Sequence, residues 1–188
     1  MYNKIKNQNI LKIKHKAYLI SFNIIMSEFK LLLSFKYKME IIKRKIIQYV
    51  FDLLNQKLKD LNAMMQDLHE ASKNETKSTA GDKHETSKAM MHLEQEKLGN
   101  QVKEIEFQLK EFNAVNFDTH SNQVVVGSLV ETNLGYFFIA TAIGKIQIDN
   151  LFVFAISNKS PLGARFLGLK PNDSIEFNNL NYTIISVM

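Results

Sequence analysis

The sequence predicts an α+β protein, in which a long antiparallel helical hairpin is followed by a small β-rich domain with one short helix. Two observations carry this prediction. Apolar residues recur at heptad-like spacing on both sides of a short polar segment. Short β-rich runs, separated by turn residues, then fill the C-terminal third. We expect four parts: an N-terminal extension at 1–38, the hairpin at 39–115 with its tip near 74–86, a linker at 116–123, and the β-rich domain at 124–188.

The N-terminal extension stands apart in composition. It holds eight lysines and a single acidic residue, Glu28, so it alone outweighs the net charge of +5 of the whole chain. Its apolar run, Ala17–Met26, is too short to span a bilayer, and no small-residue cleavage site follows it. We therefore expect no membrane partner. Because a clean helical pattern begins at Met39, we interpret Met39 as the native start and residues 1–38 as an over-extended or dispensable arm.

The first arm of the hairpin is expected from Met39 to about Lys73. No glycine or proline interrupts this stretch, and its apolar residues step by three or four. An arm of this kind forms a rod of roughly 50 Å at 1.5 Å per residue, and so long a helix needs a partner to bury its apolar stripe. The stripe consists of Ile46, Val50, Leu54, Leu58, Leu61, Met65 and Leu68.

The second arm shows the same kind of seam. Its apolar positions are Met91, Leu98, Val102, Ile105, Leu109 and Phe112. Gly99 weakens this helix by roughly 1 kcal/mol relative to alanine, and Gln95 falls where an apolar residue is expected. From the arms alone, a purely structural hairpin or a dimerisation coil is as good an interpretation as a functional one.

Between the arms lies a polar segment that ends in Gly81. Asp82 and Glu85 then open the second arm, three residues apart. The first interpretation is a capping box, in which the two carboxylates satisfy free backbone N–H groups and the helix dipole. The alternative is that they supply oxygen ligands to a hard cation such as Mg²⁺, with the remaining ligands contributed by a partner's active site.

The C-terminal part reads as short strands with one helix. The helix is expected at Pro161–Leu167, with Ser160 as its N-cap and Pro161 at its first position. The β-rich runs are Val124–Val126, Ser128–Thr132, Tyr136–Ala140, Lys145–Ile148, Leu151–Ile156, Ser174–Phe177 and Tyr182–Val187.

Several kinds of chemistry are excluded by the residues. Without cysteine there is neither a disulfide nor a thiolate site, which fits a reducing compartment. No nucleophile elbow or phosphate loop is present. The five histidines are scattered, and His84 with His92 makes an improbable metal pair. We expect no cofactor of the protein's own.

Four segments stand out when they are read together. One is Gly81-Asp82-Lys83-His84-Glu85, and the other three are Gly127-Ser128-Leu129-Val130, Ile156-Ser157-Asn158-Lys159-Ser160-Pro161-Leu162-Gly163, and Phe166-Leu167-Gly168-Leu169-Lys170-Pro171-Asn172-Asp173-Ser174-Ile175. Together they resemble the bacterial Gre transcript cleavage factors: the first is similar to that family's G-D-L-S-E tip, and the other three are similar to its FKBP-like C-terminal domain.

The resemblance implies a cytoplasmic accessory factor of RNA polymerase that is not itself an enzyme. The globular domain would dock at the rim of the secondary channel, through the region of Ser157, Ser160, Pro161 and Leu162. The coil would reach the polymerase's catalytic centre, so that contact with nascent RNA and DNA is indirect. There Asp82 and Glu85 would help to hold a Mg²⁺ shared with the polymerase, which cuts backtracked RNA by two-metal hydrolysis.

The tip departs from the family pattern at Lys83 and His84, where Leu and Ser are usual. Added positive charge beside two carboxylates opposes cation binding. Three other interpretations therefore remain: a Gre-like paralogue that binds polymerase without cleavage, a coiled-coil scaffold, and a prolyl isomerase, since FKBP-like folds include such enzymes.

Overall fold

The computed structural model describes residues 2–75, 83–119 and 121–188, with side chains from residue 22 onward apart from 24, 74–85 and 87. The chain forms two compact units, 1–42 and 43–188. Helix α1 (Tyr2–Glu75) runs through both, and α2 (Lys83–Asn113) belongs to the second. The described helices contain no stretch long and apolar enough to cross a membrane.

Helix α1 is longer than the sequence predicted. The expected arm began at Met39, whereas α1 already begins at Tyr2. The physical reason is that no glycine or proline occurs before Gly81, so nothing in the sequence ends a helix there. From Phe22 to Lys38, every side chain that the structure describes is exposed.

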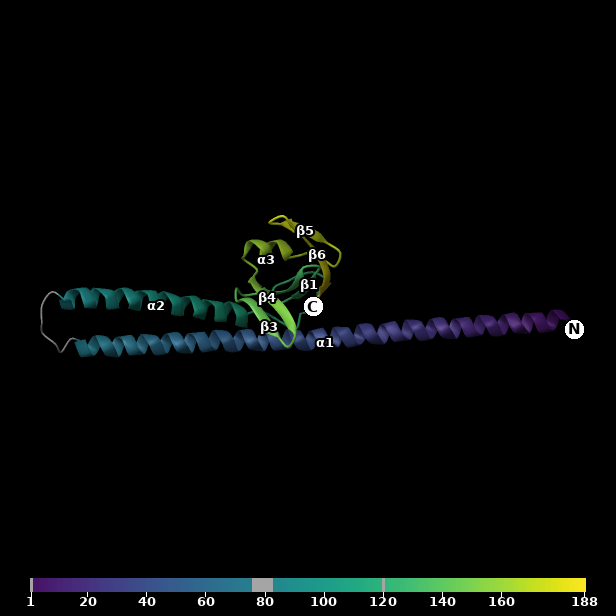
Figure 1. Cartoon of the computed structure of the whole chain (residues 1–188), viewed down its shortest axis with the longest axis horizontal. Coiled ribbons are helices and arrows are strands. Elements are labelled where there is room, and N and C mark those ends of the chain that lie inside the picture. The colour runs from purple at the N-terminus through teal and green to yellow at the C-terminus, as the bar shows by residue number, and fades with distance from the viewer. Residues whose placement is uncertain (1, 76–82, 120) are drawn as a thin grey trace. The chain divides into compact units, whose positions relative to one another are not determined.

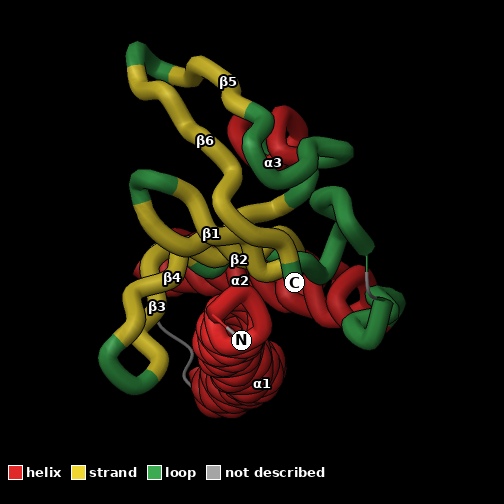
Figure 2. Tube along the Cα trace, turned by 90° about the vertical axis from the view of Figure 1, so that its right-hand side faces the viewer, coloured by secondary structure: helices red, strands yellow, loops and turns green. Residues whose placement is uncertain are grey.

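In the second unit, α2 lies alongside residues 43–75 of α1, and the two form the expected hairpin (Figures 1 and 2). The predicted seam is confirmed by burial: every one of its members is buried or half-buried. Ile46, Val50 and Leu54 are fully buried. Across the seam, a Cβ added to Gly99 would lie 3.8 Å from the Met65 Cε atom, so these two residues share one level of the hairpin.

A single six-stranded sheet forms the rest of this unit. Its strand order is β3-β4-β2-β1-β6-β5. Neighbouring strands are antiparallel except β2 and β4, which are parallel. The strands are β1 (Leu129–Thr132), β2 (Gly135–Ala140), β3 (Gly144–Ile148), β4 (Leu151–Ser157), β5 (Ser174–Phe177) and β6 (Leu180–Val187), and the short helix α3 (Pro161–Phe166) follows β4.

One predicted strand is wrong. Val124–Val126 has strand-like composition but forms no strand. The Val124 N–H donates to the Leu169 carbonyl at 2.8 Å, and the Val124 carbonyl accepts from the Gly168 N–H at 2.8 Å. The segment therefore pairs with the connection after α3 rather than with the sheet, and Gly127, with φ of 94°, turns the chain into β1. The other strands and α3 agree with the expected ranges to within two residues.

The two faces of the sheet carry different aromatic clusters, because successive side chains of β2 point to opposite sides. Phe137 packs edge to face against Phe166 of α3, with ring centroids 5.2 Å apart. On the other side, Phe138 stacks on Phe117 at 6.0 Å, and Phe117 contacts Phe112 of α2 at 4.8 Å. This second cluster joins the sheet to the base of the hairpin.

Between β1 and β2, Tyr136 is bound to Glu131. The Tyr136 hydroxyl donates to one carboxylate oxygen of Glu131 at 2.9 Å, and the Ser186 hydroxyl donates to the other at 2.8 Å. Burial, reinforced by the hydrogen bond to Glu131 and by its negative charge, raises the pKa of Tyr136 from 10.0 to about 12.

This pKa predicts alkaline destabilisation. Between pH 10 and 12 the unfolded chain has released the Tyr136 proton and the folded chain still holds it. Folded protein then binds more protons, so the free energy of unfolding falls as the pH rises through this window. In Glu131→Gln, the Tyr136 pKa should drop toward 10, because the negative charge is gone. An absorbance titration with Tyr136→Phe subtracted measures it, and an unchanged pKa would contradict the role of Glu131.

Candidate functional site

The predicted tip carboxylates fall at the junction of the two long helices. Helix α1 ends at Glu75 and α2 begins at Lys83. Asp82 lies outside the described residues, and Glu85 is described only as part of the first turn of α2. That these two carboxylates help to hold Mg²⁺ stays a prediction. Within the part of the chain whose side chains are described, no three metal-ligating side chains lie together.

The hairpin sets how far this junction stands from the sheet. Lys45 of α1 is tied to the sheet, and α1 continues to Glu75 beyond it. Thirty residues of helix extend roughly 45 Å at 1.5 Å per residue. Helix α2 covers a similar length between Lys83 and Phe112. Any group at the junction is therefore carried far from the globular domain.

The second predicted region, at the end of β4, is a tight turn into α3. The Ser160 hydroxyl donates to the Ser157 carbonyl at 2.7 Å and accepts from the Gly163 N–H at 3.1 Å. The Ser157 hydroxyl accepts from the Lys159 N–H at 3.1 Å. Ser160 is the N-cap of α3, as expected, and Pro161 follows it at the start of the helix. Both predicted serines thus hold the turn together.

Gly163 is required by this turn for steric reasons. A Cβ at this position would stand 2.1 Å from the Ser157 carbonyl oxygen and 2.9 Å from the Ser160 hydroxyl. The obstructing oxygen belongs to the backbone, so a side-chain movement cannot relieve the clash. The pattern Ser-x-x-Ser-Pro-Leu-Gly therefore encodes one compact turn.

The four predicted partner-binding residues differ in what they present to solvent. Pro161 is exposed, whereas Ser157, Ser160 and Leu162 are half-buried. Leu162 packs against the aromatic core cluster that includes Phe166. Of the four, Pro161 is the residue most available to a partner.

The turn is also tied to the hairpin through a residue that the sequence analysis did not select. Lys159 forms an ion pair with Glu111 of α2 at 2.5 Å. Its ammonium group lies 4.9 Å from the centre of the Phe107 ring, one helical turn away on the same helix. These two contacts therefore hold the candidate docking turn next to the base of α2.

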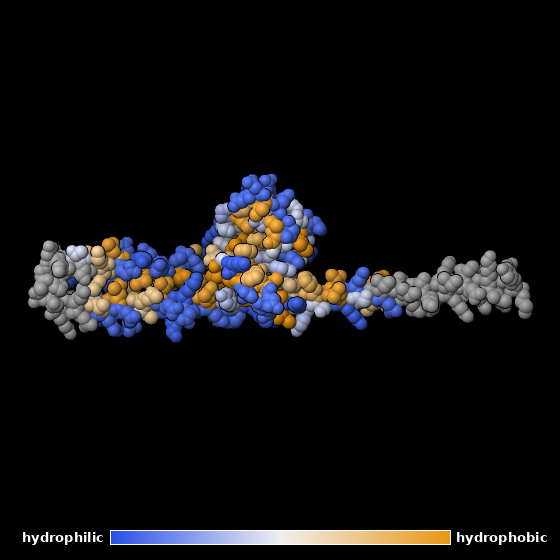
Figure 3. Space-filling model, viewed as in Figure 1, coloured by the Kyte–Doolittle hydropathy of each residue, from blue (hydrophilic) through white to orange (hydrophobic). Residues whose placement is uncertain are grey.

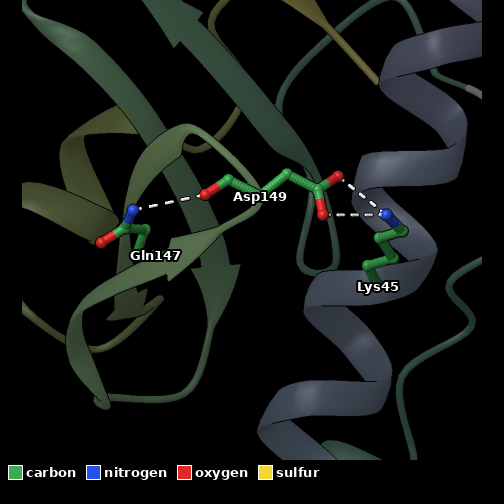
Figure 4. Close-up of polar contacts among 3 residues, drawn as sticks. All are labelled: Lys45, Gln147 and Asp149. Carbon is green, nitrogen blue, oxygen red and sulfur yellow. Dashed lines mark hydrogen bonds and ion pairs between the residues drawn. The ribbon is translucent and has the colours of Figure 1, made fainter.

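A second tie joins the β3–β4 turn to α1 (Figure 4). The Lys45 ammonium donates to both carboxylate oxygens of Asp149, at 3.0 and 2.7 Å. Asp149 sits in the left-handed region, with φ of 53°, and its carbonyl accepts from the Gln147 amide at 3.3 Å. Because both charged side chains are about half exposed, such a pair contributes only about 0.2–1 kcal/mol. Its role is orientation more than stability.

The packing and the cap of the turn between β4 and α3 can be tested by substitution of Gly163 and Ser160. We expect Gly163→Ala to lower the free energy of unfolding by about 1–3 kcal/mol, because the new methyl group overlaps the Ser157 carbonyl. Ser160→Ala should cost about 1 kcal/mol through loss of the cap. Urea denaturation followed by circular dichroism measures both. A Gly163→Ala protein as stable as the parent would contradict the packing described for this turn.

Comparison with known proteins finds a distant likeness among solved structures. No family model and no curated protein matches the chain. Among solved structures, the transcription factor Gfh1 is similar at 16% sequence identity with a TM-score of 0.31, and the match covers 73% of this chain and 92% of that one. A likeness at this identity and TM-score does not assign the chain to a family.

Proposed function

We propose that the protein is a Gre-like regulator of transcription elongation that binds RNA polymerase and inserts its helical hairpin into the secondary channel. It acts as an accessory factor within the polymerase's own active site and supplies no active site itself. One observation carries the proposal: the two segments that resemble the Gre family, 81–85 and 157–163, lie at opposite ends of the same hairpin. The tip pattern, 81–85, extends into the first turn of α2, and the docking pattern forms the turn tied to the base of α2.

The length of the hairpin suits a protein that places its tip residues far from its globular domain. Arms of roughly 45 Å are long enough to carry a group deep into a channel while the sheet stays outside. The mutual burial of Leu98 and Leu109 with the α1 stripe keeps the arms paired. Asp82 and Glu85 would act at the end of this probe, as oxygen ligands to a Mg²⁺ shared with the polymerase.

Docking is assigned to the turn between β4 and α3. Pro161 is exposed there on a rigid helix start, and the Lys159–Glu111 pair keeps the turn next to the hairpin. A partner that binds this turn therefore also fixes the orientation of the hairpin, because the turn is bound to α2.

A second candidate function has its own support. Lys83 and His84 stand between the two tip carboxylates in the sequence, and Lys88, which is exposed, follows one turn later. Positive charge beside a Mg²⁺-binding pair weakens cation binding. The alternative is a factor that occupies the channel and modulates synthesis without stimulating cleavage.

Binding is tested with the chain's two prolines, which form a matched pair. Pro161 and Pro171 are both exposed, but only Pro161 lies in the proposed docking turn. A pull-down of purified core polymerase should retain the parent protein and Pro171→Ala and lose most of Pro161→Ala. Absence of binding by the parent protein would overturn the proposal and favour a coiled-coil scaffold.

Cleavage is tested on a stalled, backtracked elongation complex. If the tip helps to hold Mg²⁺, the protein shortens the RNA and Asp82→Ala abolishes this, whereas Asp67→Ala, which removes an exposed carboxylate from α1, does not. Replacing Lys83→Leu together with His84→Ser should speed shortening by about tenfold, since a full positive charge leaves the site. No shortening by either the parent or this double variant would leave the non-cleaving regulator as the function.

A further inference from the structure

The part of α1 that precedes the hairpin carries an apolar surface of its own. From Phe22 to Lys38, every side chain that the structure describes is exposed. Hydrophobic residues are visible on the surface of this described part of the N-terminal extension in Figure 3. Proteins rarely leave so many large apolar side chains in water along one short segment. The exposed ones are Phe22, Ile25, Met26, Phe29, Leu31, Leu32, Leu33, Phe35 and Tyr37.

These residues are not spread evenly around the helix. One face is polar, because its members follow one another at steps of four, three, four and four residues: Asn23, Ser27, Lys30, Ser34 and Lys38. The opposite face is apolar and shows the i, i+3, i+4, i+7 spacing: Phe22, Ile25, Met26, Phe29, Leu32 and Leu33. Residues 22–38 therefore form an amphipathic helix whose apolar face is exposed.

The other members of the segment fit the same division. Leu31 and Phe35 lie along one border of the apolar face and widen it, and Glu28 lies on that border too. Lys36 continues the apolar face by one turn. A lysine there lays its aliphatic stem along the apolar surface and keeps its ammonium group in water.

Charge adds a second constraint on the partner. The N-terminal extension has eight lysines against Glu28, a net charge of +7, whereas residues 39–188 carry a net charge of −2. The positive charge of the protein is thus concentrated in the same part of the chain as the exposed apolar face. A partner that matches both features has negative charge at its surface and an apolar interior close behind it.

Three kinds of partner can be compared on this basis. A nucleic acid matches the lysines but offers no aliphatic interior to the six residues of the apolar face. A second copy of the chain offers an apolar face but brings the same net charge of +7, which repels. An anionic lipid surface offers negative headgroups and acyl chains beneath them. Only the lipid surface complements both the charge and the apolar face.

We propose that residues 22–38 bind an anionic membrane surface, with the helix axis parallel to the plane of the bilayer. The apolar face enters the boundary of the acyl chains, and Lys30, Lys36 and Lys38 contact the headgroups. The expectation of no membrane partner rested on an apolar run too short to span a bilayer. An interfacial helix does not cross the bilayer, so that limit does not apply to it. The proposal goes beyond the proposed function and does not depend on it.

The test is co-sedimentation of the full 188-residue protein with vesicles. We expect binding to phosphatidylcholine vesicles that contain about one third phosphatidylglycerol, and at least about tenfold weaker binding to phosphatidylcholine alone. Changing Lys30, Lys36 and Lys38 together to Gln should weaken binding to the anionic vesicles by about tenfold or more. The matched control makes the same three changes at exposed lysines of the hairpin and should bind like the parent: Lys57, Lys59 and Lys103.

A neutral pair of substitutions tests the apolar face. Phe29→Gln with Leu32→Gln should also weaken vesicle binding by about tenfold or more, because two large side chains no longer enter the acyl region. Its control is Met64→Gln with Leu93→Gln, which removes two apolar side chains of the hairpin that are 54% and 66% exposed. Circular dichroism verifies that each variant keeps the helix content of the parent.

Several outcomes would overturn the proposal. One is a parent protein that binds neither kind of vesicle or binds both equally. Another is full binding by the variant with Phe29→Gln and Leu32→Gln, since the attraction would then come from charge alone. Sedimentation velocity without lipid examines the second copy: an oligomer that this double variant dissociates would assign the apolar face to self-association and overturn membrane binding. Neither measurement involves polymerase, so failure of this proposal is distinguished from failure of the proposed function.

Discussion

The aromatic contact at the base of the hairpin is the constraint on which the rest of the second unit depends. Phe112 ends the seam of α2, Phe138 belongs to the inner strand β2, and Phe117 packs between them. This cluster packs the base of α2 directly against the sheet. With it, the arms leave the domain in one direction, and the ion pairs at Lys45 and Lys159 hold that direction at the edges. Gly127 allows this closeness, because a Cβ there would stand 2.8 Å from Val115.

Much of this arrangement could be predicted from the sequence, and the reason is physical. The seam residues recur with the helical period, so burial in the hairpin follows from periodicity alone. Most strands are bounded by glycine or asparagine in positive-φ turns, such as Gly135, Gly144 and Asn178. The N-cap Ser160 and the following Pro161 likewise predict the start of α3 from local sequence alone.

What the sequence could not reveal depends on distant pairs. Lys159 and Glu111 are 48 residues apart, and Lys45 and Asp149 are 104 apart, so no local pattern selects them. The β-branched residues of Val124–Val126 suit a strand, whereas the backbone of Val124 bonds to Gly168 and Leu169 and that of Val125 bonds to Ser128. The resemblance to a family tip selects Asp82 and Glu85 only by residue type and spacing, so a metal-binding role for them stays a prediction.

Burial along α1 has a mechanical consequence. Ile46, Val50 and Leu54 next to the sheet are fully buried, whereas Leu61, Met65 and Leu68 farther out are only half-buried. Since local opening costs least where the fewest apolar contacts are lost, resistance to opening falls with distance from the sheet. The hairpin is therefore rigid where it packs next to the sheet and more flexible toward its far end. Under the proposed function, the outer part of the hairpin would bend to follow the walls of the channel while its base keeps the angle of entry.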